Sequence, residues 1–150
     1  MASGLCLAVD PGLTTGWVLF RPVTRQEIDV VRWGETRGEA EFEAIAWEMN
    51  RQEHVGRVVC EEFIPYRDKV RTWEPEALHV IGALRFIFGI RHVNLRQRPA
   101  DAIAWKNAGH CKPYQRGYKH EAVGYGGEGH AVMALAHGLL WTANSWNGVS

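Results

Sequence analysis

The first half of the chain alternates short apolar runs with glycine and proline, which is the pattern of a β-meander. Breaks are expected at the Pro11–Gly12 turn and at Pro22, because both are strong turn formers. A later apolar run ends in two glutamates and predicts a central strand, and an alternating run further on predicts another. The predicted strands cover residues 4–10, 16–21, 27–34, 57–63 and 91–97.

Apolar residues recur at intervals of three and four in other segments, which indicates amphipathic helices. Residues 109–129 are rich in glycine and basic side chains and predict a loop. Strands followed by alternating helices and strands predict an α/β fold with a five-stranded mixed sheet flanked by helices. A chain of 150 residues, 46% of them apolar, suits one core, so we expect a single domain over residues 1–150. The predicted helices cover residues 38–54, 75–88, 100–107 and 129–143.

Composition argues against several classes of protein. The chain has no apolar run long enough to cross a membrane, and no basic segment precedes its first apolar stretch, so we expect a cytoplasmic protein without membrane contact. The three cysteines are an odd number without a Cys-x-x-Cys pair, which argues against a disulfide framework or a structural zinc site. Cys6 and Cys60 lie in apolar runs and are expected in the core.

The net charge is zero, but charge is segregated along the chain. Residues 1–84 hold nine Lys or Arg and fourteen Asp or Glu, residues 85–120 hold eight and one, and residues 121–150 hold none and two. A basic block attracts phosphates, whereas carboxylates hold cations. The combination is typical of a metal-dependent nuclease, although an ordinary solvated face also explains the basic block.

Acidic residues stand at the ends of two predicted strands. Asp10 ends the first strand, and Glu61 and Glu62 lie at the end of the fourth. If these strands are neighbours, carboxylates meet at one edge of the sheet, where a hard cation such as Mg2+ would bind. Only one of the two glutamates can join Asp10, because successive side chains point to opposite faces of a sheet. His130 opens the last helix beside Glu128 and adds a third candidate ligand.

Three segments resemble RuvC-type Holliday junction resolvases, especially the short phage and prophage versions. They read D-P-G-L-T-T-G-W at 10–17, V-V-C-E-E-F at 58–63 and G-H-A-V-M-A-L-A-H at 129–137. The resemblance spans nearly the whole chain, and the three motifs occur in the family's order. It implies an RNase H-like fold, a homodimer and symmetric cleavage of four-way DNA junctions with a divalent metal, Mg2+ or Mn2+ as its substitute.

By this resemblance, Asp10 and Glu61 match the family's first two acidic ligands. His130 falls at the third ligand position, which some members fill with Asp and others with His. The implied chemistry is hydrolysis of a phosphodiester between two metal ions about 4 Å apart. The fourth position is normally aspartate, but in this chain it is Met133. A thioether is a poor ligand for Mg2+, so the resemblance leaves the second half of the metal site open.

Three explanations for Met133 are compatible with the sequence. Glu128 would supply the missing carboxylate if the start of the helix is displaced. His137, two turns after His130 on the same helical face, would assist, although packing or DNA contact explains it as well. Alternatively, the site is impaired and the protein binds DNA without cutting it efficiently.

The resemblance also implies a DNA-binding surface formed by two segments. A basic segment before the last helix matches family lysines that contact DNA. The residues after the fourth strand match the place where the family probes the opened centre of the junction, and an aromatic ring there would stack on an unpaired base. Packing is an equally good explanation for each tyrosine in these segments, Tyr114 and Tyr118 included. The candidate residues are Lys106, Lys112, Arg116 and Lys119, with Phe63, Tyr66 and Arg67 after the strand.

Other functions share parts of these patterns. The first motif also resembles the first phosphate loop of the actin and sugar-kinase superfamily, but ATP is bound there between two domains, and 150 residues leave no room for the second. An RNase H-like nuclease of other specificity is an alternative, because the sequence does not specify a junction. A junction-binding protein with an impaired active site is the alternative that is not an enzyme.

Overall fold

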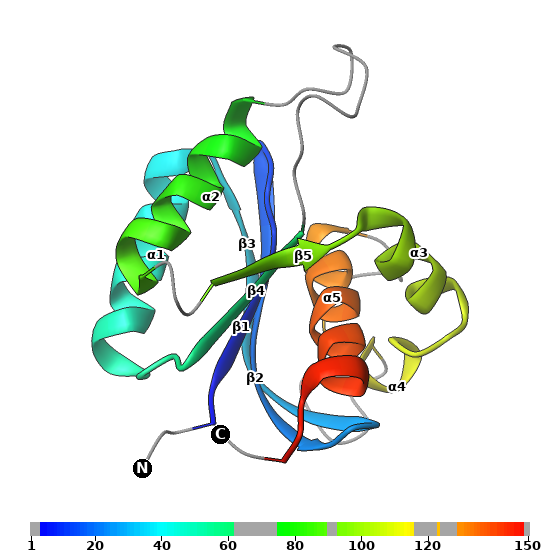
Figure 1. The fold of residues 1–150 in the computed structure, drawn as a ribbon. Coiled ribbons are helices and arrows are strands. Elements are labelled where there is room, and N and C mark those ends of the chain that lie inside the picture. The colour runs from blue at the N-terminus through cyan, green and yellow to red at the C-terminus, as the bar shows by residue number, and fades with distance from the viewer. Residues whose placement is uncertain (1–3, 62–74, 90–92, 116–122, 124–128, 149–150) are drawn as a thin grey trace.

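The computed structural model describes residues 4–61, 75–89, 93–115, 123 and 129–148, and its architecture is a mixed β-sheet with helices on both faces (Figure 1). This confirms the predicted α/β class with a mixed sheet flanked by helices. Among the described residues, no helix is long and apolar enough to cross a membrane.

The sheet has the strand order β3-β2-β1-β4-β5. The first three strands form the predicted antiparallel meander, whereas β4 runs parallel to β1 and β5 runs parallel to β4. The parallel pairing of β1 and β4 brings the ends of both strands to the same edge of the sheet. The strands are β1 (Cys6–Asp10), β2 (Thr14–Thr24), β3 (Glu27–Arg37), β4 (Arg57–Glu61) and β5 (Val93–Gln97).

Helices cover both faces of the sheet (Figure 1). α1 and α2 pack on one face, and α5 lies on the other, where it contacts β1, β2 and α3. Alternation along the strands divides the core accordingly: Ala8 and Val18 pack towards α5, whereas Leu7 and Leu19 pack towards α1 and α2. The helices are α1 (Glu39–Gln52), α2 (Pro75–Phe88), α3 (Pro99–Asn107), α4 (Lys112–Gln115) and α5 (His130–Ser145).

Two local predictions were wrong. Pro22 does not end the second strand, because β2 continues to Thr24 in a long hairpin with β3. β1 pairs with β2 only as far as Phe20, so no hydrogen bond to β1 is lost at the proline. Within the predicted loop at 109–129, residues Lys112–Gln115 form the single-turn helix α4, which buries Tyr114 against the core.

Candidate metal centre

The ends of β1 and β4 bring the two predicted carboxylates together. Val9 pairs with Cys60 in the parallel ladder, so Asp10 and Glu61 are the next residues along their strands. Both side chains point to the α5 face of the sheet, because Ala8 and Val59, two residues earlier in each strand, pack in the core on that side. Glu61 is therefore the glutamate that joins Asp10. Glu62 lies outside the described residues.

Asp10 begins a row of paired residues that crosses the sheet from β1 through β2 to β3. Asp10 lies opposite Gly16, and Gly16 lies opposite Glu35. In the middle of the row, a glycine is required because the start of α5 rests directly on it. A Cβ atom at residue 16 would lie 2.0 Å from the carbonyl carbon and oxygen of His130 and 2.4 Å from the nitrogen of Ala131. The glycine of the T-T-G-W segment therefore sets how closely α5 approaches the sheet.

The acidic neighbours of Gly16 contact the start of α5 from its two sides. On one side, Nδ1 of His130 lies 3.1 Å from Oδ2 of Asp10. On the other side, Oε2 of Glu35 accepts hydrogen bonds from the backbone N–H groups of His130, at 2.8 Å, and Ala131, at 3.0 Å. Glu35 was not predictable from the sequence, because one glutamate in an alternating edge strand carries no signal of a distant helix.

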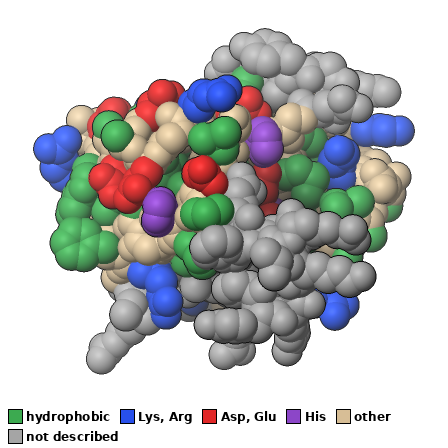
Figure 2. All heavy atoms as spheres, turned by 90° about the horizontal axis from the view of Figure 1, so that it is seen from above, with side chains coloured by type: hydrophobic (Ala, Val, Ile, Leu, Met, Phe, Trp, Pro, Cys, Tyr) green, Lys and Arg blue, Asp and Glu red, His purple; other side chains and the backbone are tan. Residues whose placement is uncertain are grey.

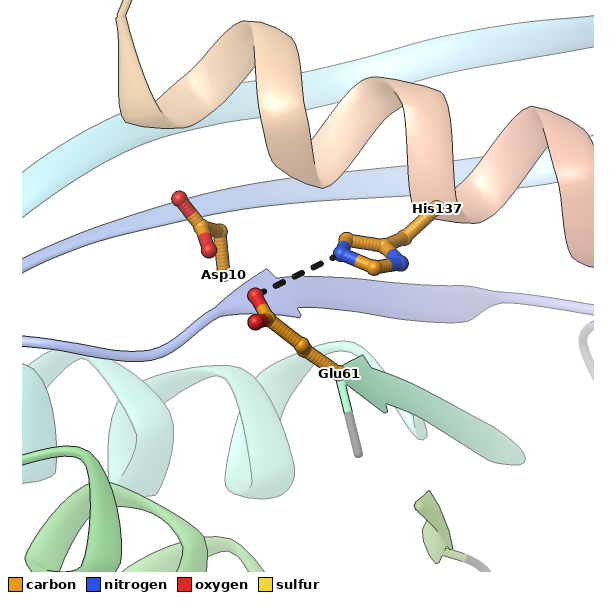
Figure 3. Close-up of side chains that lie close together, drawn as sticks. All are labelled: Asp10, Glu61 and His137. Atoms are coloured by element: carbon orange, nitrogen blue, oxygen red, sulfur yellow. Dashed lines mark ion pairs between the residues drawn. The ribbon is translucent and has the colours of Figure 1, made fainter. Parts of the chain in front are cut away.

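Among the described residues, a cluster of potential metal ligands consists of Asp10, Glu61 and His137 (Figure 3). One ligand atom from each residue lies within 4.8 Å of the other two. His137 comes from the middle of α5 and is fully buried, with Nε2 3.6 Å from Oε2 of Glu61. Asp10 and Glu61 are partly exposed, so the cluster is open to solvent on the carboxylate side.

Glu61 is poised to act as an anion. Burial raises the pKa of its carboxyl group, but the interactions with the His137 ring, 3.6 Å away, and with Asp10 outweigh burial and hold the pKa below its ordinary value. Glu61 therefore carries its negative charge at neutral pH. A second carboxylate beside it makes the cluster favourable for a cation.

The donor set fits a divalent metal ion. Oxygen and imidazole ligands bind such ions at about 2.0–2.2 Å, so two donors of one ion lie at most about 4.4 Å apart. The observed spacing requires only small side-chain rotations to reach that range. Two carboxylates with an imidazole suit Mn2+ as well as Mg2+, because imidazole is a softer donor than oxygen.

The geometry differs from the predicted ligand set in its histidine. His130 contacts Asp10 but does not belong to the close cluster among the described residues, whereas His137 does. Met133, one turn before His137, packs against the hydrophobic core. Glu128 lies outside the described residues. The spacing of seven residues between the histidines was the only signal in the sequence for His137.

This edge of the molecule is an accessible, mixed-charge surface. Figure 2 looks down on the end of the molecule where β1 and β4 finish, and acidic side chains and histidines gather there with basic side chains nearer the rim. Half of the His130 side chain is exposed. A ligand approaching the cluster would therefore meet the His130 ring before the less exposed side chains of Asp10 and Glu61.

Of the predicted DNA contacts, Lys106 lies in α3 and Lys112 in α4, where its side chain is exposed. Tyr114 has a structural role: it is buried, and its hydroxyl accepts a hydrogen bond from the backbone N–H of Ile28 at 3.1 Å. The other candidates, with Tyr118, lie outside the described residues: Phe63, Tyr66, Arg67, Arg116 and Lys119.

The three cysteines are poor candidates for a nucleophile. All three are buried, as predicted for Cys6 and Cys60. Burial raises the pKa of Cys6 and Cys111 to about 12 and that of Cys60 well above its ordinary value. Because the thiolate is the reactive form, thiol chemistry is disfavoured and the carboxylate cluster is the better candidate for a reactive site.

Comparisons with known proteins give matches by structure alone. No protein-family model matches the sequence, and no curated protein matches it. RuvC from Thermus thermophilus in complex with a Holliday junction substrate superimposes with a TM-score of 0.67 at 14% identity, covering 90% of this chain and 90% of that chain. A second structure of Thermus thermophilus RuvC gives 0.65 at 13% identity, covering 90% of this chain and 91% of the other.

A viral protein shares the same architecture. The Fowlpox virus resolvase, solved with a substrate Holliday junction DNA, superimposes with a TM-score of 0.55 at 11% identity, covering 92% of this chain and 96% of that chain. All three matches extend over almost the full length of both partners. The chain therefore has the fold of RuvC-type Holliday junction resolvases.

Proposed function

We propose that this protein is a metal-dependent endonuclease of the RNase H-like type that resolves four-way or other branched DNA junctions. The observation that carries the proposal is the cluster of Asp10, Glu61 and His137 at the end of two adjacent parallel strands, in a chain with the RuvC fold. Two of the structural neighbours were solved with Holliday junction DNA, which supports a branched substrate. Such an enzyme would work in the cytoplasm of a bacterium or of a phage-infected host.

In this proposal, Asp10, Glu61 and His137 hold Mg2+ or Mn2+. The bound ion would lower the pKa of a water and stabilise the leaving oxygen of the phosphodiester. Glu61 enters the reaction already ionised, because its pKa is held low. The His130 ring, half exposed and 3.1 Å from Asp10, is available as a further ligand or as a hydrogen-bond partner of the scissile phosphate. Glu128 stays a candidate for an additional carboxylate.

DNA binding would depend on the basic segment around α3 and α4. Lys106 and Lys112 belong to the block that holds eight basic residues and one acidic residue, together with Arg116 and Lys119. Contacts of this kind are made to phosphates and release counterions, so binding would weaken steeply with salt. Phe63, Tyr66 and Arg67 are proposed to contact the opened centre of the junction.

The proposal is tested by incubating the protein with a synthetic four-way junction and with a linear duplex of the same sequence. We expect paired nicks in the junction with Mn2+ or Mg2+, no cleavage after chelation with EDTA, and at least about a hundredfold slower cleavage of the duplex. Gel separation of end-labelled strands measures both rates. Binding of the junction without cleavage in either metal would instead support the junction-binding protein, and cleavage of an RNA–DNA hybrid alone would support the RNase H alternative.

A homodimer is part of the proposal, and the face formed by α1 and α2 is its interface. Phe86 in α2 is 80% exposed and stacks edge-on against Trp47 of α1, which is also exposed. The same face has a groove of about 410 Å³ between the two helices, bordered by Leu78 and Gly82. A projecting aromatic ring beside a groove is self-complementary, which a twofold interface requires. A second copy is also the partner that the resemblance to RuvC implies.

We expect Phe86→Glu to weaken this dimer at least about thirtyfold, because it removes an aromatic contact worth about 2 kcal/mol and adds charge close to Glu39 and Glu43. Sedimentation equilibrium over a range of concentrations measures the dissociation constant. Ile103→Ser, which removes another exposed apolar side chain from α3, is the matched control and should leave the dimer intact. A monomeric wild-type protein, or an unchanged constant for Phe86→Glu, would rule out this interface.

A further inference from the structure

We propose that Glu35 is a positioning residue that fixes the start of α5 and thereby holds His130 against Asp10. The inference deepens the proposed function and rests on it. Glu35 lies in β3, outside the metal cluster, and belongs to none of the three motifs that resemble the RuvC family. Its role follows from the hydrogen bonds at the start of α5 and from the strand register beneath it.

The start of α5 lacks a cap of its own. Residue 129 is a glycine without a side-chain cap, and the first turn has no acidic residue. The first N–H groups of a helix have no intrahelical acceptor, and the helix dipole adds partial positive charge at the same place. Oε2 of Glu35 accepts hydrogen bonds from the N–H groups of both His130 and Ala131. A carboxylate from a distant strand therefore supplies the cap.

The strand register gives this cap its effect on the site. Asp10, Gly16 and Glu35 are paired across β1, β2 and β3, and the first residue of α5 lies on the glycine in the middle. Glu35 holds the backbone of His130 on one side, while the ring of the same residue reaches Asp10 on the other side. A shift of the backbone of His130 would consequently displace its ring from Asp10.

The conformation of Gly129 is consistent with the cap that Glu35 forms on α5. Its φ is +124°, which side-chain-bearing residues rarely adopt, and a Cβ atom there would lie 3.0 Å from Oε2 of Glu35. The chain thus enters α5 through a glycine that leaves the carboxylate in contact with the N–H groups. Because α1 also begins after a glycine without a side-chain cap, its first amides provide an internal comparison.

The test uses three variants of the full-length protein. Glu35→Ala removes both hydrogen bonds, Glu35→Gln keeps an acceptor oxygen without the charge, and Glu41→Ala is the control, because it removes one exposed negative charge from α1. Amide hydrogen exchange reports on the cap without any need for activity. In the wild-type protein, we expect the amides of His130 and Ala131 to exchange about tenfold more slowly than those of Glu39 and Ala40, and we expect Glu35→Ala to abolish this difference.

Junction cleavage reports on the positioning. We expect Glu35→Ala to lower kcat about tenfold to a hundredfold with little change in KM, Glu35→Gln to recover most of the loss, and Glu41→Ala to leave kcat within about twofold. The role is overturned if Glu35→Ala leaves the exchange of His130 and Ala131 unchanged, or if kcat of the folded variant equals that of the wild type. It is also overturned if Glu35→Gln is as damaging as Glu35→Ala and both weaken Mn2+ binding, because Glu35 would then act as a ligand. If the wild-type protein cuts no junction but its amides show the exchange difference, the proposed function is wrong and the cap by Glu35 is supported.

Discussion

Replacing Asp10 by asparagine is expected to abolish junction cleavage while preserving junction binding. The substitution removes one of the two carboxylate charges of the metal cluster without changing the size of the side chain. A metal ligand of this kind contributes several kcal/mol of transition-state stabilisation, so the rate should fall about a hundredfold to ten-thousandfold. DNA affinity should stay within about threefold, because the proposed phosphate contacts lie on α3, α4 and the segment after them.

Stability provides a second readout for Asp10→Asn. Asparagine has nearly the size of aspartate and keeps a polar group beside Glu61, but it carries no negative charge for a bound cation. We therefore expect the metal-free variant to unfold close to the temperature of the wild-type protein and to lose the stabilisation that Mn2+ gives the wild type. Differential scanning calorimetry with and without Mn2+ measures both effects. Asp29→Asn, the same change at an exposed position of β3, should leave cleavage and metal stabilisation unaltered. Cleavage by Asp10→Asn at the wild-type rate would exclude Asp10 as a ligand.

The second large effect is expected for Gly16→Ala. The new methyl group would lie 2.0 Å from backbone atoms of His130, which cannot rotate out of the way, so the start of α5 must move. Overpacking of this kind costs about 1–3 kcal/mol, which corresponds to a fall of several degrees in the unfolding temperature. A displacement of about 1 Å in a catalytic group costs about a hundredfold in rate, and both histidines lie on α5. We therefore expect the unfolding temperature and the rate of junction cleavage to decrease together in Gly16→Ala.

Gly56→Ala is the matched control for Gly16→Ala. A Cβ atom at residue 56 meets only the carbonyl oxygen of Leu5, at an ordinary contact distance of 3.7 Å. We expect its unfolding temperature and cleavage rate to stay close to those of the wild-type protein. Should Gly16→Ala behave in the same way as this control, the close approach of α5 to β2 would not be what positions the site.

Local sequence was sufficient for most of the fold. Runs of apolar residues bounded by Pro11–Gly12 and by acidic residues predicted β1 and β4, and periodic apolar residues predicted α1, α2 and α5, because burial of one face imposes that period. The wrong prediction at Pro22 arose because the end of a strand depends on which neighbouring strands it pairs with. Pro22 is tolerated because β2 at that point pairs with β3 and has passed the end of its pairing with β1, which depends on the sheet as a whole.

The candidate site likewise contains residues that were predictable from local sequence and residues that were not. Asp10 and Glu61 were predictable, since acids at the ends of two apolar strands must meet if the strands are parallel neighbours, and the structure has that pairing. The choice between His130 and His137 was not predictable, because both lie on one helical face and their distances to the strands depend on how deeply α5 packs. That depth is set by Gly16, which allows the helix backbone to touch β2.

The sequence by itself determined the α/β class, the strand ends that carry the carboxylates and the helix that carries the histidines, because apolar period and turn residues act over a few positions. Only the tertiary structure decided which histidine joins the carboxylates and that Glu35 caps α5. These contacts join residues 76 to 127 positions apart, and they form only when the sheet register aligns Asp10, Gly16 and Glu35 beneath one helix.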